Sequence, residues 1–424
     1  MSKNSFDVIV AGGGPAGATA AYSLASAGVE VAILDKATFP RDKSCGGGLI
    51  AKVLHDLPLD VKPVIRNAMN GMCFTYRFGG RFTKRHYEPV VYGTLRREFD
   101  NYLVEQAVRQ GATLMDGTGV EGFEQNGEGA VNVLTRAGSL SCRVLIGADG
   151  ANGVVRRALN NEQAFFNQAG LSFEIERERI IEDRVDGALM RVDWGTLPSG
   201  YAWIFPKGDF LNIGVGGPVA IGKRLKPYLH EFLVNERILR TDRVSLDDLN
   251  VSGHKLPTFT ERTRLSDRNV LVIGDAAGLI EPLTGDGISY GVQSARLAAD
   301  VVLHWLSGAC RDLSEYREAV LREIVPEIVY TRKFLAFFNA FPTLVHQVVS
   351  RDDRVWQAFC RVLKGEEAFH LLRRKKMGRF YGVTKYVDRF AFYYEARRLK
   401  YPQASETLFQ RMVGRMLERI GGLI

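Results

Sequence analysis

The sequence FDVIVAGGGPAG, residues 6–17, decides how this chain begins to fold. Its first half, residues 6–11, is apolar enough to predict a buried parallel strand. Small side chains continue over residues 16–27 and predict a helix, which Gly28 would end. A strand that turns directly into a helix through a glycine-rich loop is typical of a dinucleotide-binding unit.

The loop glycines have separate expected tasks. Gly12 would allow the tight turn, Gly14 would let a pyrophosphate approach the backbone, and Gly17 would let helix and strand pack closely. The free N–H groups of the helix N-terminus would then face the phosphates. Asp35 follows the second predicted strand, where its carboxylate can bind a ribose 2′-hydroxyl. The residues predicted to bind the dinucleotide here are Gly12, Gly14, Pro15, Ala16, Gly17, Asp35 and Lys36.

Length and composition exclude several classes of protein. With 424 residues, 46% of them hydrophobic, the chain can bury a large core and is expected to hold two or three domains. Its five cysteines and seven histidines show no spacing typical of disulfide frameworks or metal sites. The first strand leaves no room for a signal peptide, and no run reaches the ~18 apolar residues of a spanning helix. We therefore expect a cytoplasmic protein without a metal.

Positive charge gathers in the C-terminal quarter. Residues 331–424 carry 19 Lys or Arg against 8 Asp or Glu, interleaved with aromatic side chains. This pattern suits peripheral contact with the inner, anionic face of a membrane. The alternative is a solvated basic face over a domain core. Nucleic acid is not expected as a partner, because no recognition motif accompanies the charge.

Two further glycine motifs follow the first. An apolar stretch, residues 144–148, runs into Asp149-Gly150, and another, residues 269–273, runs into Gly274-Asp275. A glycine-rich loop with Gly285 and Gly287 comes next, and residues 288–306 then show helical spacing. The N-terminus of this helix would face the same ligand and stabilise negative charge on it.

These three motifs, in this order, resemble those of the FAD-binding flavoproteins with the aromatic hydroxylase fold. The resemblance covers most of residues 1–310 and implies that the first motif holds the ADP part of FAD. It implies that Asp275 contacts the ribityl and pyrophosphate region. Arg96 matches the arginine of that family's RxxFD segment near the cofactor, and Arg97 is the competing candidate.

Two more segments resemble the geranylgeranyl reductase family within this fold. The first is Tyr201-Ala202-Trp203-Ile204-Phe205-Pro206, followed by Gly214-Val215-Gly216, and the second is Cys45-Gly46-Gly47-Gly48. Alternate residues of a strand face one side, so Tyr201, Trp203 and Phe205 would form one aromatic wall beside a polyprenyl chain. The alternative is an ordinary core strand. The residues predicted to bind substrate are Phe205, Pro206, Gly214 and Gly216.

Cys45 precedes a helix predicted over residues 49–57. In that position its thiol could donate a proton or take part in redox chemistry, or it could simply fill space over the flavin. The residues predicted to be catalytic are Cys45, Tyr201 and Trp203. The remaining residues predicted to bind FAD are Cys45, Gly46, Arg96, Asp149, Gly150, Gly274, Asp275, Gly285, Gly287 and Ile288.

The predicted fold class is α/β. Residues 1–71, 94–160 and 265–310 would form a discontinuous, Rossmann-type FAD-binding domain. Residues 72–93 and 161–264 would form an inserted antiparallel-sheet domain that binds substrate, and residues 311–424 a mainly helical C-terminal region.

The resemblance implies an FAD-dependent reductase that saturates carbon–carbon double bonds of a polyprenyl substrate or lipid. NADPH, binding transiently, or a reduced ferredoxin docking on basic surface would supply the electrons. The alternative is an NAD(P)H-dependent flavin monooxygenase, since the same scaffold hydroxylates aromatic rings. A flavin-containing lipid-binding protein without turnover is the third possibility.

Overall fold

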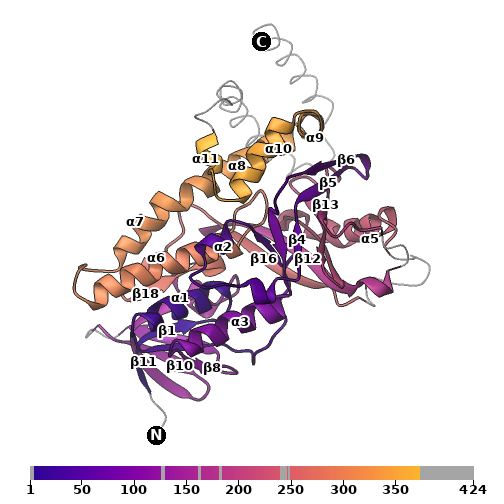
Figure 1. The fold of residues 1–424 in the computed structure, drawn as a ribbon. Helices are drawn as coiled ribbons and strands as arrows, with labels where there is room; N and C mark the ends of the chain where they lie inside the picture. The colour runs from indigo at the N-terminus through magenta and orange to yellow at the C-terminus, as the bar shows by residue number, and fades with distance from the viewer. Residues whose placement is uncertain are drawn as a thin grey trace.

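The computed structural model describes residues 4–125, 129–160, 164–180, 184–238, 246 and 249–372. Within them the chain forms two large sheets, a small third sheet and a group of C-terminal helices (Figure 1). One large cavity is lined by residues from all of these parts.

The first large sheet is built on the expected strand, helix and strand unit. Its strands follow the order β17-β18-β11-β1-β2-β8, and β10 and β9 extend it beside β11. The central neighbours β18, β11, β1, β2 and β8 run parallel, as buried apolar strands linked by helical crossovers do. The strands are β1 Ser5–Ala11, β2 Val31–Leu34, β8 Thr113–Met115, β9 Val120–Gln125, β10 Val131–Thr135, β11 Gly138–Gly147, β17 Ser266–Asp267 and β18 Val270–Val272.

Three long helices accompany this sheet. Helix α1 (Pro15–Ser26) packs between α3 (Arg96–Arg109) and α6 (Ile288–Leu306), and α6 has the bounds expected from the sequence. Small side chains let α1 approach its neighbours closely, and its buried face joins the largest apolar core of the molecule. The first sheet therefore presents the carboxyl ends of its parallel strands, and two helix N-termini, to one side.

The second large sheet has seven strands in the order β16-β12-β15-β14-β13-β5-β6. Its neighbours run antiparallel, as expected, except that β5 and β13 run parallel. Helix α5 (Leu225–Asn235) packs on its outer face over a second apolar core (Figure 1). The strands are β5 Gly71–Tyr76, β6 Gly79–Arg85, β12 Phe165–Glu176, β13 Leu189–Trp194, β14 Tyr201–Lys207, β15 Phe210–Pro218 and β16 Ser252–Phe259.

A small third sheet corrects one expectation. Residues 49–57 were expected to be one helix, but β3 (Gly48–Ile50) is a strand and only α2 (Val53–Asp56) is helical. Leu49 pairs with Tyr92 of β7 (Val91–Gly93), and β4 (Asn67–Met69) pairs with β7 from its other side. Backbone pairing with a strand some 40 residues away thus overrides the local helical pattern.

The C-terminal part of the described chain is helical, as expected. Helices α7 and α8 lie in the region expected to be mainly helical, residues 311–424, of which residues 373–424 lie outside the described part of the chain. In the part that the structure describes, no helix is both long and apolar enough to cross a membrane. The helices are α7 Ser314–Glu323, α8 Val325–Ala340, α9 Pro342–Arg351, α10 Asp353–Leu363 and α11 Phe369–Leu372.

The short elements complete the chain. They are η1 Lys62–Val64, α4 Val154–Leu159, η3 Arg177–Arg179, η4 Val219–Arg224 and η6 Gly274–Ala277. The domain boundaries given above stay a prediction.

The glycine loop allows a matched test of packing. A Cβ at position 17 would lie 1.9 Å from the Gly12 carbonyl oxygen, whereas a Cβ at position 14 would meet only a flexible Arg41 guanidinium nitrogen at 3.7 Å. We expect Gly17→Ala to lower the free energy of unfolding by about 3 kcal/mol through overpacking. Gly14→Ala, at a helix N-cap, should cost less than about 1 kcal/mol. Urea unfolding measures both, and equal losses would contradict this account of the loop.

Candidate active site

The glycine loop between β1 and α1 lies at one end of a large cavity. Gly12 has a φ of +108°, and a Cβ there would lie 2.4 Å from the Ala148 carbonyl oxygen. Gly14, Pro15 and Ala16 line the cavity, and a Cβ on Gly14 would meet only the flexible Arg41 guanidinium, at 3.7 Å. The loop therefore offers bare backbone to a ligand at Gly14 and has room for no side chain at Gly12 or Gly17.

Asp35 lies at the end of β2 and is tied to this loop. Its carboxylate accepts hydrogen bonds from the backbone N–H of Gly13 and of Ala37, both at 2.9 Å. Arg41 lies 3.8 Å from the same carboxylate. Lys36 is exposed and lies outside the residues that line the cavity. The acid is thus held beside the loop, where a ribose bound at this end could reach it.

The two arginine candidates at the start of α3 have different surroundings. Arg96 is buried, lines the cavity and forms two hydrogen bonds of 2.7 Å with the carboxylate of Asp100. Burial opposes its charge, but Asp100, and after it Cys45, raise the pKa of Arg96. Arg97 is exposed. Arg96 therefore places a permanent positive charge at the wall of the cavity.

The second and third glycine motifs meet the first at the same cavity. Asp149 follows β11, and its carboxylate accepts a hydrogen bond of 2.7 Å from the N–H of Val155 at the start of α4. Burial raises the pKa of Asp149 to about 6, against the backbone N–H groups that favour its charge. Gly150 and Gly274 both line the cavity. The carboxyl ends of three parallel strands thus surround one space.

Asp275 has two basic side chains as neighbours. Lys43 Nζ lies 3.4 Å and His254 Nε2 lies 3.3 Å from its Oδ2. Burial would favour the protonated carboxyl, but Lys43 and His254 hold the pKa of Asp275 below its ordinary range. The carboxylate is therefore charged, and it can accept hydrogen bonds from ligand hydroxyl groups.

The loop before α6 closes this end of the cavity. Gly285, Gly287 and Ile288 line it, and Gly287 is the N-cap of the helix. Asp286 accepts a hydrogen bond from Ser289 N at 3.1 Å. The free N–H groups and positive dipole end of α6 therefore face the ligand space.

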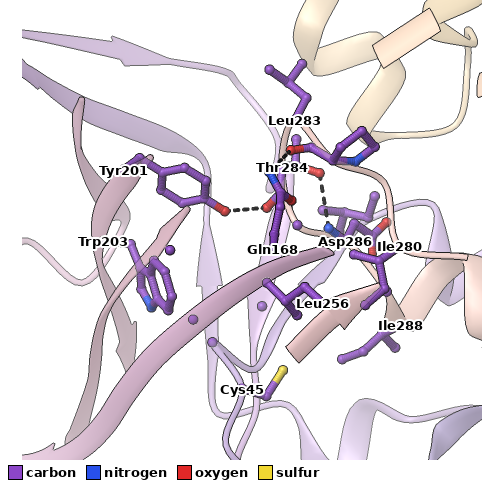
Figure 2. A pocket seen from close by; sticks show the side chains of 18 of the residues that line it. Cys45, Gln168, Tyr201, Trp203, Leu256, Ile280, Leu283, Thr284, Asp286 and Ile288 are labelled. Atoms are coloured by element: carbon purple, nitrogen blue, oxygen red, sulfur yellow. Dashed lines mark hydrogen bonds between the residues drawn. The ribbon is translucent and has the colours of Figure 1, made fainter. Parts of the chain in front are cut away.

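The predicted aromatic wall lies on β14. Tyr201, Trp203 and Phe205 all line the cavity. The ring centroids of Tyr201 and Trp203 are 5.7 Å apart, and those of Trp203 and Phe205 are 6.0 Å apart. Figure 2 shows Tyr201 and Trp203 on one side of the cavity and Ile288 on the other. Tyr201 donates a hydrogen bond of 2.6 Å to the carbonyl of Thr284. This bond ties the wall to the loop that precedes α6.

The glycines after the wall explain its shape. Strands β14 and β15 are antiparallel, and their register places Gly216 opposite Tyr201 and Gly214 opposite Trp203. A Cβ at position 214 would lie 2.3 Å from the Trp203 ring, so this glycine makes the space that the indole occupies. Pro206 and Gly214 do not line the cavity, whereas Gly216 does.

The cysteine segment packs against the wall. A Cβ on Gly46 would lie 2.8 Å from the Phe205 ring, and Cys45 itself lines the cavity (Figure 2). Asn212 joins the two segments, because it accepts from Trp203 Nε1 at 2.8 Å and donates to the Cys45 carbonyl at 3.0 Å. The helix expected directly after Cys45 is replaced by the strand β3, so the thiol does not precede a helix in the chain.

Beyond the wall the cavity continues between the second sheet and the C-terminal helices. Strands β5 and β13 contribute apolar side chains to it, and α8–α11 cover it. Several aromatic residues expected at a membrane surface lie here instead, and none of those in the described chain is exposed. The cavity-lining aromatic residues of these helices are Tyr330, Phe334, Phe338, Trp356, Phe359 and Phe369.

The residues present fit FAD. Bare backbone at Gly14, the carboxylate of Asp275 and the N-terminus of α6 are the groups expected around a pyrophosphate, a ribityl chain and a flavin ring. They line one continuous space, with Asp35 held beside the glycine loop. Metal binding finds no comparable support, because in the part of the chain described here no three His, Cys, Asp or Glu side chains are grouped as ligands.

Comparisons with known proteins agree with this geometry. A family model described as an FAD binding domain matches residues 5–193. The chain is 31% identical to the menaquinone reductase of Mycobacterium tuberculosis, over 85% of this chain and 95% of that protein. It is 30% identical to the geranylgeranyl diphosphate reductase of Rhodobacter capsulatus, over 75% of this chain and 80% of that protein. A geranylgeranyl bacteriochlorophyll reductase-like structure from Thermoplasma acidophilum matches with a TM-score of 0.68 and 20% identity, over 98% of this chain and all of that one.

These matches confirm the predicted fold class and the FAD-binding domain. Sequence reasoning missed Asn212, the link between the wall and Cys45, and also missed Trp194. The position of Asn212, two residues before Gly214 in the strand that pairs with the wall, was the available signal.

The Arg96–Asp100 pair can be tested against its exposed neighbour. Asp100→Asn removes the charge that compensates buried Arg96, so we expect a loss of about 3 kcal/mol or more in the free energy of unfolding. Arg97→Ala should change it by less than about 0.5 kcal/mol. Chemical denaturation measures both free energies of unfolding. An Asp100→Asn protein as stable as the Arg97→Ala protein would refute the conclusion that Arg96 is the buried, charge-paired arginine of the cavity.

Proposed function

Because the chain belongs to the geranylgeranyl reductase family of FAD-dependent oxidoreductases, we propose that it saturates isolated carbon–carbon double bonds in a polyprenyl substrate. Bound FAD supplies the redox chemistry, because its reduced form donates hydride equivalents. The observation that supports this proposal best is the single cavity that runs from the glycine motifs, past three aromatic rings, to the C-terminal helices.

In this proposal the aromatic wall orients the substrate. An isolated alkene is a poor hydride acceptor, so its double bond must be held in register. Trp203 suits this task because its ring is fixed by Asn212 on one side and by Gly214 beneath it. Phe205 extends the flat apolar surface. The polyprenyl chain would lie against these rings by shape and apolar burial.

Tyr201 and Cys45 would have different tasks. Burial, and after it Glu281, raises the pKa of Tyr201, and its hydroxyl already donates to the Thr284 carbonyl. This phenol would therefore keep its proton and fix the position of the wall. The Cys45 thiol lines the cavity beside the same rings, and we assign to it the proton that completes saturation of the double bond.

The electron donor is proposed to be NADPH or a reduced ferredoxin. Mixing the purified flavoprotein with each donor anaerobically, and following the loss of flavin absorbance, separates the two. Peripheral membrane contact through residues 331–424 also stays a prediction, since residues 373–424 lie outside the described part of the chain.

The proposed reaction has a direct test by mass. Purified protein should contain FAD, and after chemical reduction without oxygen it should add two hydrogens per bond to a polyprenyl quinone or polyprenyl lipid. Mass spectrometry of the extracted substrate measures this gain. Unchanged substrate would refute the proposal, and substrate-dependent oxygen consumption with a hydroxylated product would favour a monooxygenase instead.

The wall can be tested by a matched pair of tryptophan variants. Trp203→Leu should lower kcat/KM by about 100-fold, because the reacting bond loses its orientation. Trp305→Leu alters a tryptophan of α6 that stacks with Arg143 outside the cavity, and it should leave kcat/KM near the wild-type value. Flavin absorbance per protein should be equal in both. A Trp203→Leu enzyme with normal kcat/KM would remove the wall from the mechanism.

A further inference from the structure

Asp286 places a carboxylate at the N-terminus of α6. It precedes the N-cap Gly287, and its Oδ1 accepts a hydrogen bond of 3.1 Å from Ser289 N. The residue lines the cavity at the end that fits FAD, and its side chain is only 7% exposed. The carboxylate therefore brings negative charge to a helix end whose own dipole is positive.

Lys52 supplies the compensating charge from a distant part of the chain. Its Nζ lies 3.9 Å from Asp286 Oδ2, and it also lies 3.9 Å from the centroid of the Tyr290 ring in the first turn of α6. Asp286 forms no other ion pair among the described residues. The Lys52 side chain is 17% exposed, so water screens this pair only partly.

The backbone of Lys52 is held by the helices that cover the cavity. Its N–H donates a hydrogen bond of 2.9 Å to the carbonyl of Leu363 at the end of α10. A Cβ on Gly365 would lie 3.0 Å from the Cβ of Lys52. Leu363 lines the part of the cavity beyond the aromatic wall, which we call the substrate half. Lys52 itself does not line the cavity, so its charge acts there through Asp286.

A second ion pair nearby offers a comparison. Arg296 of α6 lies 3.5 Å from the carboxylate of Asp56 in α2, and the two side chains are 49% and 31% exposed. Neither residue lines the cavity. Solvent screens an exposed pair of this kind, so it contributes little to the electric field inside the cavity.

The charge at the N-terminus of α6 matters because FAD changes charge when it is reduced. Two electrons and one proton leave the ring negatively charged, and nearby protein charges then set the stability of the reduced form. The dipole of α6 favours that negative charge, whereas an uncompensated Asp286 carboxylate would oppose it. Compensation of Asp286 therefore favours reduction.

We propose that Lys52 raises the reduction potential of bound FAD by neutralising Asp286 at the N-terminus of α6. Lys52 is then a positioning residue, which acts through Asp286 and touches neither the cofactor nor the substrate. This inference rests on the proposed function and deepens it, because it assigns control of the reducing power that saturation of a double bond requires.

The experiment measures the midpoint potential of the FAD-loaded protein without substrate, by spectrophotometric titration against reference dyes. Lys52→Met keeps an apolar stem over Tyr290 but removes the ammonium. Reduced FAD should become about tenfold less stable relative to oxidised FAD, which lowers the two-electron potential by about 30 mV. Lys52→Arg keeps the charge and should stay near the wild-type potential.

Asp286→Asn should move the potential in the opposite direction. Its amide oxygen can still accept from Ser289 N, but the negative charge is gone, so the potential should rise by about 30 mV. The double variant of Lys52→Met and Asp286→Asn should lie near wild type, because both charges are then absent. Shifts of the same sign in the two single variants would indicate a merely structural pair and would overturn the inference.

Arg296→Met is the matched control, since it removes a basic side chain that pairs with an acid outside the cavity. It should change the relative stability of reduced FAD by less than about twofold. A shift as large as that of Lys52→Met would overturn the inference, and so would an unchanged potential in Lys52→Met. If Lys52→Met does not bind FAD, the sign of the Asp286→Asn shift decides, and a potential at or below the wild-type value would overturn the inference.

The potential and the proposed reaction are tested separately. Flavin absorbance per protein should be equal in all variants, which shows that the cofactor site is intact. Since the potentials are measured without substrate, failure of the reduced enzyme to saturate any polyprenyl compound would overturn the proposed function alone. The expected shifts with such a failure would leave the role of Lys52 in place.

Discussion

The packing of the Trp203 indole over Gly214 is the contact on which the rest of the site depends. The register of β14 and β15 places this glycine opposite the tryptophan, and any side chain there would occupy the space of the ring. With the ring seated, its N–H reaches Asn212, and Asn212 in turn holds the carbonyl of Cys45. One cross-strand pair therefore fixes both the aromatic wall and the loop that carries the thiol.

The distribution of charge gives the cavity its direction. Carboxylates and cations stand near the glycine loops, where α1 and α6 also present their N-termini. They are paired with each other, so a cofactor with a pyrophosphate meets donors and fixed dipoles rather than an excess of either charge. Past the wall, the lining is apolar and suits a hydrocarbon chain.

The C-terminal helices take a part that their composition does not suggest. Their aromatic residues resemble those of a membrane-facing segment, but Phe334, Phe338 and Trp356 turn inward and complete the cavity. Helix α8 is joined to the loop between β13 and β14 by the Asn339–Ser199 pair. Glu327 of the same helix accepts hydrogen bonds from the N–H groups of Phe369 and His370 in α11. The cover over the substrate half is thus held by specific contacts.

The sequence by itself determined the features that arise within a few residues of each other. Hydrophobic periodicity predicts the first strand, the helix after it and the helix at residues 288–306, and the glycines between strand and helix predict a tight loop. The glycines that follow Trp203 were found by their resemblance to a known family. Other features depended on partners distant in the chain. Residues 49 and 50 form a strand rather than a helix because Leu49 pairs with β7, and Arg96 is distinguished from Arg97 by its burial against Asp100. Local patterns fix which elements form, but burial and pairing are set by the neighbours that tertiary structure brings together.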